Sequence, residues 1–543
     1  MSTTVAALTV AALIDNGMRN LYCLPGVQND PFFDALYDHT DRLQPVQARH
    51  EQGAAYMALG AALATGEPQA FCVVPGPGIL NATAALATAY AVNAPVLALV
   101  GQIPSRTIGR GFGLLHEIPD QLGVLRGLTK FAARIERAED ARAVLTEALQ
   151  ALRSGRPRPV AVEVPVDVWS ALVAEDFPIG EMRGQPAPAL NDGAIAQAAE
   201  RLRQARHPML VLGGGAQGVS REVTELAERL GAPSVAFRNG QGVVAADNPL
   251  SVGTPVGHAL WPQVDVVVGL GSRLSAQQLQ WGVDDDLDII HIDIDELELG
   301  RVKAPAIGIH ADLKDALPAL LAALGNAGDA RENWRAQVVE AKARFADIYS
   351  KELGPQMGWL AAIRAALPRD GVFVDELTQC GYVSRFAFPS YAPRTALSTG
   401  YQGTLGYGIA TAIGAAHARP DTKVVSITGD GGALFTITEL ACAVQHQIPV
   451  TIIVFNDNAF GNVRRLQKDN YNARFIASDL KSPDFVALAE SFGAVGMRAE
   501  TPAALQAALT QAFTESGPVL VEVPFGEVPS PWAYVLPPKV RGV

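Results

Sequence analysis

The amino-acid sequence predicts an α/β fold with three doubly wound parallel-sheet domains, and three observations lead to this prediction. The chain has 543 residues, enough for three domains of roughly 150 to 180 residues each. Apolar runs of strand length alternate with helical stretches. The same order of helix and strand occurs near both ends of the chain, which indicates two related domains on either side of a third.

The repeat is clearest where each of the two related domains ends. A predicted helix over residues 141–152 leads to a strand over 158–165, and a helix over 502–513 leads in the same way to a strand over 517–524. Earlier in each half, a helix of small residues precedes a strand and then a glycine-rich loop. These helices are predicted over residues 53–65 and 403–416, and the loops are Pro75-Gly76-Pro77-Gly78 and Gly429-Asp430-Gly431-Gly432.

The repeat divides the chain into three expected domains. The two related domains cover residues 1–175 and 355–543, and the middle domain covers residues 190–325. Three strands are predicted for the middle domain, over residues 208–212, 265–270 and 288–294.

Two segments are expected to link these domains. Residues 168–192 are rich in proline, glycine and charge, and residues 325–358 are polar and include a charged helix predicted over 333–353. Gly213-Gly214-Gly215 follows the first strand of the middle domain, but it lacks the GxGxxG spacing of dinucleotide-binding loops. We interpret it as a structural turn, so the sequence contains no secure signal for FAD.

Composition excludes several classes of partner. The net charge of −12 argues against nucleic acid and anionic membranes, and no apolar stretch reaches the about 18 residues that span a bilayer. The N-terminal stretch has no basic leader, so we do not expect it to be a secretory signal. We expect a cytoplasmic protein whose cysteines are buried free thiols without CxxC spacing; these are Cys23, Cys72, Cys380 and Cys442.

Two aspartates predict a metal site at one sheet edge. Asp430 follows the apolar strand 424–428, and Asp457, 27 positions later, follows a second strand predicted over 450–455 after a helix over 435–447. Parallel strands bring their carboxyl ends to the same edge, so the two carboxylates should lie close together. Carboxylate oxygens suit Mg²⁺, and the adjacent glycines allow a bulky anion to approach the backbone. A diphosphate bridged to Mg²⁺ fits this pattern.

This pattern resembles the cofactor motif of the thiamine diphosphate (ThDP) enzymes, in which a GDG tripeptide is followed by an Asn-Asn pair. The resemblance implies a pyrimidine-binding domain, a middle Rossmann-like domain and a diphosphate-binding domain, in that order. It also implies that Asp430, Asp457 and the carbonyl of Ala459 bind Mg²⁺. Asp457 departs from the usual asparagine, and it adds negative charge beside the phosphates. The implied contacts to the diphosphate come from Gly429, Gly431, Gly432 and Asn458.

The resemblance also assigns the residues that activate and bend the cofactor. Glu51, at the start of a glycine- and alanine-rich helix, matches the glutamate that contacts the pyrimidine ring. Leu405 matches the apolar side chain between the two rings, and the carbonyl of Gly403 would accept from the 4'-amino group. Thr378 and Gln379 follow another predicted strand where the family contacts diphosphate.

Over essentially the whole chain, the sequence looks most like acetolactate synthase. His116-Glu117 sits where that enzyme has a Gln-Glu pair near its active site, and a histidine can exchange protons near neutral pH. A surface-loop histidine is the alternative. Gln28 lies in a loop that faces the thiazolium in the family. Leu466 stands where acetolactate synthase carries a tryptophan that favours 2-oxobutyrate, which argues against a biosynthetic role.

The resemblance implies ThDP- and Mg²⁺-dependent cleavage or decarboxylation of a pyruvate-like 2-oxo acid through an enamine, followed by carboligation. A simple 2-oxo acid decarboxylase, a lyase for an acyl-CoA or diketone, an FAD-dependent enzyme and an inactive paralogue are the alternatives. Because the family's sites form between two subunits, a homodimer is the expected minimal active unit, and a homotetramer the expected assembly.

Overall fold

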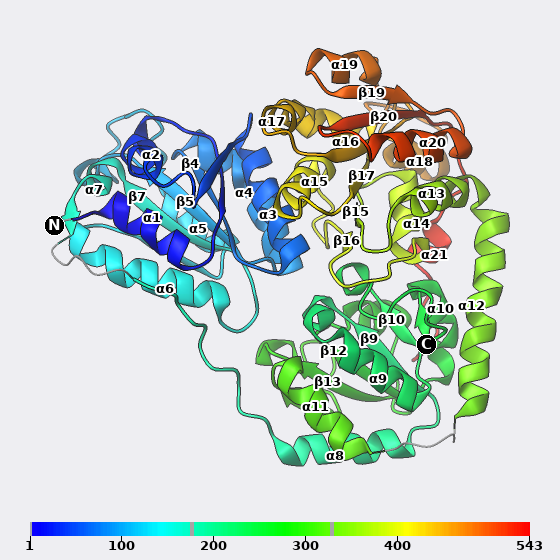
Figure 1. The fold of residues 1–543 in the computed structure, drawn as a ribbon. Helices are drawn as coiled ribbons and strands as arrows, with labels where there is room; N and C mark the ends of the chain where they lie inside the picture. The colour runs from blue at the N-terminus through cyan, green and yellow to red at the C-terminus, as the bar shows by residue number, and fades with distance from the viewer. Residues whose placement is uncertain (1–2, 174–178, 326–330, 543) are drawn as a thin grey trace.

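The computed structural model describes residues 3–173, 179–325 and 331–542, and these form three lobes with one six-stranded sheet each (Figure 1). Parts of both predicted linkers lie outside the described residues. The strands within each of these sheets pair in parallel. The predicted α/β fold with three parallel-sheet domains is confirmed.

The first lobe is a sheet covered by helices on both faces. Its helices are α1 (Val5–Asp15), α2 (Asp30–Tyr37), α3 (Glu51–Thr65), α4 (Pro77–Val92), α5 (Gln121–Leu128), α6 (Ala141–Arg153) and α7 (Val166–Trp169). Its strands are β2 (Asn20–Cys23), β3 (Gln44–Gln47), β4 (Gln69–Val73), β5 (Val96–Gln102), β6 (Phe131–Arg134) and β7 (Val160–Pro165). They lie in the order β3-β2-β4-β5-β7-β6. The short strands β1 (Thr3–Thr4) and β8 (Leu172–Val173) pair separately and antiparallel.

The third lobe repeats this topology. Its strands are β15 (Val372–Val374), β16 (Ala396–Leu397), β17 (Val424–Gly429), β18 (Val450–Asn456), β19 (Val495–Arg498) and β20 (Val519–Pro524). They lie in the order β16-β15-β17-β18-β20-β19, which is the order of the first sheet, strand for strand. Its helices are α13 (Gly354–Ala366), α14 (Gln379–Ala387), α15 (Tyr407–Ala418), α16 (Asp430–Thr436), α17 (Leu440–Gln445), α18 (Gly461–Asn470), α19 (Phe485–Ser491), α20 (Pro502–Ala512) and α21 (Trp532–Val535).

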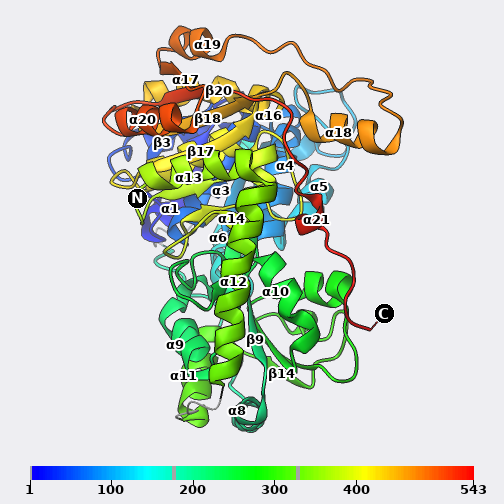
Figure 2. The ribbon, with the colours of Figure 1, turned by 90° about the vertical axis from the view of Figure 1, so that its right-hand side faces the viewer.

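The middle lobe has a different strand order. Its strands are β9 (Pro208–Leu212), β10 (Ser234–Ala236), β11 (Ser251–Val252), β12 (Val266–Leu270), β13 (Asp288–Asp293) and β14 (Ile307–His310), and its helices are α8 (Asp192–Gln204), α9 (Ser220–Leu230), α10 (Thr254–Leu260) and α11 (Leu313–Leu324). The order β11-β10-β9-β12-β13-β14 is the Rossmann order 3-2-1-4-5-6. The long helix α12 (Glu332–Glu352) runs from this lobe to the third (Figure 2).

The glycine-rich loop of the middle lobe forms a compact turn. Residues Gly214–Gly218 make a short 3-10 helix directly after β9. A Cβ placed on Gly213 would lie 2.0 Å from the carbonyl oxygen of Gly271, so the two backbones are in close contact. These glycines are therefore explained by packing between the ends of β9 and β12.

The helix after β17 was predicted wrongly at its start. It was expected over residues 435–447, but α16 already begins at Asp430 because the glycine loop itself closes into the first helical turn. A 3-10 turn at Ile437–Glu439 then separates α16 from α17, which ends at Gln445. Asp430 is therefore held in a helical turn rather than in an open loop.

The helix predicted over residues 403–416 also begins later, at Tyr407. Gly403 and Gly406 have φ angles of 59° and 80°, which a right-handed helix does not contain. The segment before Tyr407 is thus a glycine-supported turn that carries Leu405.

Helices α3 and α15 join the first and third lobes, and they hold equivalent places in the two repeated sheets (Figure 1). A Cβ on Gly60 would stand 1.9 Å from the carbonyl oxygen of Thr411, and a Cβ on Gly414 would stand 1.9 Å from that of Met57. The two backbones therefore touch. Because Gly60 faces Thr411 while Met57 faces Gly414, the helices run antiparallel.

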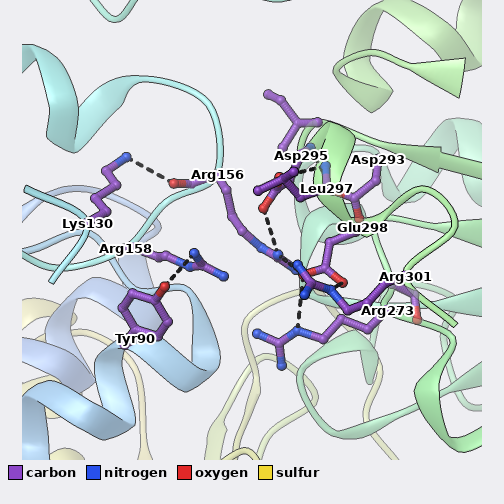
Figure 3. A network of polar contacts seen from close by, with 12 residues as sticks. Tyr90, Lys130, Arg156, Arg158, Arg273, Asp293, Asp295, Leu297, Glu298 and Arg301 are labelled. Carbon is purple, nitrogen blue, oxygen red and sulfur yellow. Dashed lines mark hydrogen bonds and ion pairs between the residues drawn. The ribbon is translucent and has the colours of Figure 1, made fainter. Parts of the chain in front are cut away.

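A network of charges fixes the first lobe to the middle lobe (Figure 3). Arg156, in the loop after α6, donates to Asp295 at 3.0 Å and also to Glu298. Glu298 is buried, and its second oxygen accepts from Arg301 at 2.9 Å. Such buried, paired charges specify how two surfaces fit.

The C-terminal segment returns from the third lobe to the middle lobe (Figure 2). Trp532 donates from Nε1 to Asn462 at 2.8 Å, and its ring lies 5.1 Å from that of Tyr382. Farther along, Arg541 is buried and donates to Asp284 at 2.7 Å. The segment is therefore attached at both ends.

Two further expectations concern the chain as a whole. All four cysteines are buried free thiols, as predicted. No helix within residues 3–173, 179–325 and 331–542 is long and apolar enough to cross a membrane. The cytoplasmic location stays a prediction.

Candidate active site

A pocket of about 180 Å³ opens at the carboxyl ends of β15, β17 and β18. All residues that line it belong to the third lobe. They include most of the residues predicted to bind the cofactor and metal, namely Thr378, Gln379, Leu405, Gly429, Asp430, Gly431, Gly432, Asp457 and Ala459. Of the other two, Asn458 lines a neighbouring pocket, and Gly403 lies in the turn before α15.

The two predicted metal ligands lie together in this pocket. Asp430 is buried; its Oδ2 accepts from the Ser482 hydroxyl at 2.6 Å, and its Oδ1 has no hydrogen-bond partner. Burial, and then the negative charge of Asp430, raises the pKa of Asp457 to about 7. Two carboxylates that oppose each other's ionisation form a site where a cation would be stabilising.

These residues fit a magnesium diphosphate. The oxygen of Asp430 that lacks a hydrogen-bond partner and the neighbouring carboxyl group of Asp457 suit a divalent cation. The residue Ala459 also lines the pocket, and its carbonyl is available as a third ligand. Gly429 leaves room, since a Cβ there would meet nothing closer than 3.8 Å. Within the described residues no group of three or more His, Cys, Asp or Glu side chains could hold a metal ion, so Asp430 and Asp457 have no third partner of these types there.

The turn that carries Leu405 is held by a residue that sequence reasoning missed. Glu376 is fully buried, and its two oxygens accept from the backbone N–H groups of Gly406 (2.8 Å) and Gly408 (2.7 Å). Burial raises the pKa of Glu376 to about 7. A Cβ on Gly432 would lie 2.2 Å from Glu376, so this carboxyl also contacts the GDG loop. The pair of acids after the buried strand β15, Asp375 and Glu376, was the available signal.

Thr378 and Gln379 begin α14 at the rim of the pocket. The Thr378 hydroxyl accepts from Gly381 N–H at 3.0 Å and so caps the helix, while its own proton stays available for a ligand. The Gln379 amide oxygen accepts from Arg465. Both side chains therefore stand where an anion in the pocket would meet hydrogen-bond donors.

The predicted catalytic acid lies in the first lobe, away from this pocket. Glu51 is the first residue of α3, is 9% exposed, and accepts from Asn81 at 2.9 Å. The loop before it is held by Glu439 of the third lobe, which accepts from the N–H groups of Arg49 and His50. Burial raises the pKa of Glu439 to about 7. The sequence contained no sign of this contact, because the two residues are far apart along the chain.

Gln28 and His116 lie together near Glu51. His116 Nδ1 is 3.1 Å from Gln28 Oε1, and Gln28 donates to the carbonyl of Leu115 at 3.2 Å. The backbone of His116 touches Gly76, and a Cβ on Gly78 of the same loop would lie 3.6 Å from Glu51. The structure thus groups the three predicted catalytic side chains around one loop of the first lobe.

The pocket that contains Asp430 and Asp457 is called the diphosphate pocket below, after its expected ligand. Within one chain, the group around Glu51 and this pocket are separate. Glu51 stands at the N-terminal end of α3, and Leu405 precedes the N-terminal end of α15. Since the two helices are antiparallel, these ends point in opposite directions. The residues predicted for the site therefore lie in two separate groups, and one chain does not bring them together.

Comparison with known proteins identifies the family. Three family models match, and they describe the N-terminal TPP binding domain, the central domain and the C-terminal TPP binding domain of thiamine pyrophosphate enzymes. They match residues 3–124, 195–320 and 378–523, respectively. Each match falls on a different one of the three lobes.

Similar proteins match along almost the whole chain. A probable acetolactate synthase large subunit of Methanocaldococcus jannaschii is 33% identical, with 95% of this chain and 91% of that protein covered. The acetolactate synthase isozyme 1 large subunit of Escherichia coli is 30% identical (96% and 93% covered), and a probable 2-ketoarginine decarboxylase of Pseudomonas aeruginosa is 31% identical (96% and 94% covered). The chain therefore belongs to the thiamine pyrophosphate enzymes and stands close to acetolactate synthase.

Proposed function

We propose that this protein is a ThDP- and Mg²⁺-dependent enzyme that cleaves the bond between the carbonyl and carboxyl carbons of a pyruvate-like 2-oxo acid and joins the remaining fragment to a second carbonyl. The observation that carries the proposal is the pocket that Asp430 and Asp457 line together with Leu405 and the glycine loop. In it, the charge of Asp430 contributes to the raised pKa of Asp457. When bound, ThDP would supply an electron sink for the electron pair that remains on the carbonyl carbon after CO₂ leaves.

The roles of the protein's own side chains follow from their places. Asp430, Asp457 and the Ala459 carbonyl would hold Mg²⁺, and Leu405 would set the cofactor's shape from its Glu376-held turn. Glu51 would share a proton with the pyrimidine ring. His116, held by Gln28, would exchange a proton with substrate or product.

The separation of the two halves supports a dimer as the active unit. A second copy could cover the diphosphate pocket of one chain with the Glu51 group of the other. Apolar side chains are exposed beside both halves, as expected for surfaces that another copy covers: Val27, Leu80 and Leu115 in the first lobe, and Leu434 and Phe435 in the third. We propose a homodimer as the minimal active unit, assembled further into a homotetramer.

Mixed dimers test this arrangement. Glu51→Gln and Asp430→Asn should each lower turnover by about 10²- to 10⁴-fold, the range for general acid–base groups and metal ligands. Heterodimers that contain one chain of each variant should recover about half of the wild-type turnover, because one of their two sites is intact. Heterodimers as inactive as the parents would show that each site forms within one chain.

The donor and the outcome need a product screen. The protein is incubated with ThDP, Mg²⁺ and pyruvate, 2-oxobutyrate or benzoylformate, and the products are identified. An acetolactate-type product supports carboligation. Simple decarboxylation is the second candidate, because a probable 2-ketoarginine decarboxylase is as similar as the acetolactate synthases, so 2-ketoarginine belongs in the screen. Release of an aldehyde and CO₂ alone would favour it.

Two earlier alternatives have their own measurements. Visible absorption of the purified protein detects FAD, which forms no part of the proposed reaction. Binding of ThDP and Mg²⁺ without turnover of any 2-oxo acid would identify an inactive paralogue.

A further inference from the structure

We propose that Arg465 binds a phosphate group of the diphosphate and offsets the extra negative charge of Asp457; this inference rests on the proposed cofactor site. Arg465 lies on α18, which begins directly after the metal-binding loop. It lines a pocket of about 310 Å³ that shares Gln379, Asp457 and Ala459 with the diphosphate pocket. Of the two pockets, Arg465 itself lines only the second, and its hydrogen bond to Gln379 connects it to a side chain that lines both.

Arg465 differs from the neighbouring cations of its helix because it has no carboxylate partner in the described part of the chain. Arg464 pairs with Asp479 at 2.7 Å, and Lys468 pairs with Glu527. By contrast, Nη2 of Arg465 donates to the amide oxygen of Gln379, and its Nη1 is buried without any hydrogen-bond partner. A half-buried guanidinium with unused donors is costly unless an anion completes it.

The surroundings of Arg465 indicate where that anion would lie. Its side-chain partner among the residues that the structure describes, Gln379, lines the diphosphate pocket. A Cβ on Gly461, the first residue of α18, would meet Asp457 Oδ2 at 2.3 Å and Gln379 Nε2 at 3.4 Å, so these two side chains converge on one point. Burial lowers the pKa of the Arg465 guanidinium, and the charges of Asp469, Tyr382, Glu527 and, least of these, Asp457 oppose this shift. An anion beside Gln379 and Asp457 would therefore be within reach of Arg465.

Charge balance gives a physical reason for an arginine here. Asp430 and Asp457 bring two potential negative charges to the place where an anionic diphosphate must bind. One Mg²⁺ ion compensates the carboxylates but leaves the phosphates under-neutralised. A guanidinium matches phosphate oxygens with parallel N–H donors, and such charged hydrogen bonds are stronger than neutral ones.

The test measures binding rather than turnover. Isothermal titration calorimetry gives the Kd of ThDP and, separately, of inorganic pyrophosphate, each with saturating Mg²⁺, for wild type, Arg465→Gln and Arg465→Lys. Arg465→Gln should raise both Kd values by about 10- to 100-fold, the loss expected for one charged hydrogen-bonding group, and Arg465→Lys should recover part of the loss. No residue of α18 is buried, so the variants should fold.

Arg464→Gln is the matched control, because it removes the same charge one residue away from a guanidinium that already has a partner. Its Kd values should stay within about 3-fold of wild type, as expected for a surface pair. Equal losses in both variants, or unchanged Kd values in Arg465→Gln, would overturn the inference. An unchanged Kd with a raised KM for the 2-oxo acid would assign Arg465 to the substrate carboxylate instead. If wild type binds neither ThDP nor pyrophosphate, the proposed function itself fails.

Discussion

Asp457 shows how one changed residue alters the chemistry of the site. In the cofactor motif that the sequence resembles, this position is asparagine, whereas here a second carboxylate joins Asp430. Burial and the charge of Asp430 raise the pKa of Asp457 to about 7. Without metal, the folded protein therefore keeps a proton that the unfolded chain has already lost, and the contribution of this group to stability is present at acid pH and is lost as pH rises through about 7.

Magnesium should compete with that proton. We predict that the Kd for Mg²⁺ falls about 10-fold between pH 6 and pH 8, because one carboxyl group must lose its proton to bind the ion. Calorimetric titration of Mg²⁺ at several pH values measures the dependence. In Asp457→Asn it should be nearly flat, and an equally steep dependence in that variant would place the titrating proton on another group.

At the level of residues, most of the side chains that the sequence assigned to the cofactor and the metal line one pocket, and their roles stay predictions. The assignment came from the GDG motif, its spacing to Asp457 and the family resemblance. Glu376 and the unpaired state of Arg465 were not predicted, because both depend on contacts between segments that are distant in the sequence. The sequence also could not reveal that Glu51 and Leu405 stand at opposite ends of a helix pair, since spacing carries no information on helix direction.

At the level of elements, the contact between α3 and α15 depends on glycine. The helices approach so closely that a single methyl group at Gly60 would overlap a carbonyl oxygen of the partner helix. Small residues with little side-chain bulk are what such a contact requires. The small residues of both segments were visible in the sequence, and they led to the prediction of a helix in each. The sequence could not show that the two helices pack on each other.

A methyl group at this contact should loosen the joint between the first and third lobes. We predict that Gly60→Ala destabilises the protein by about 1–3 kcal/mol, the usual cost of overpacking, and lowers the Tm. The control is Gly127→Ala in α5, where a Cβ would meet nothing within 4 Å and better helix propensity should stabilise by about 0.5–1 kcal/mol. Differential scanning calorimetry compares the two; equal Tm values for both variants would contradict the close contact.

On the scale of the whole molecule, the C-terminal segment connects the rim of the diphosphate pocket to the middle lobe. Tyr382 and Asn462 line the pocket, and both contact Trp532. Arg541 attaches the end of the segment to the middle lobe through Asp284 and the carbonyls of Trp261 and Val264. The middle lobe is thereby tied to the cofactor site without supplying a side chain to it.

Loss of the contacts that Arg541 makes with the middle lobe should be detectable by limited proteolysis. Arg541→Ala removes a buried guanidinium that holds two carbonyls and a carboxylate, and we expect faster proteolytic cleavage of the C-terminal segment, with the rest of the chain unaffected. Limited proteolysis followed by mass spectrometry of the fragments measures the rate. Lys539→Ala, which removes an exposed neighbour, is the control. Equal cleavage of wild type and Arg541→Ala would show that the other contacts of the segment, such as those of Trp532 and Tyr534, are enough to hold it.

The antiparallel pair of α3 and α15 has a consequence for the symmetry of the molecule. The first and third lobes have the same strand order, and they touch through equivalent helices, glycine against backbone in both directions. A surface that meets its own equivalent in this way makes an isologous contact, the kind that identical subunits form around a twofold axis. Each chain thus contains a contact of the kind that joins two symmetrical subunits. A dimer of two chains would place a twofold axis between subunits that each already contain such a symmetrical pair of lobes.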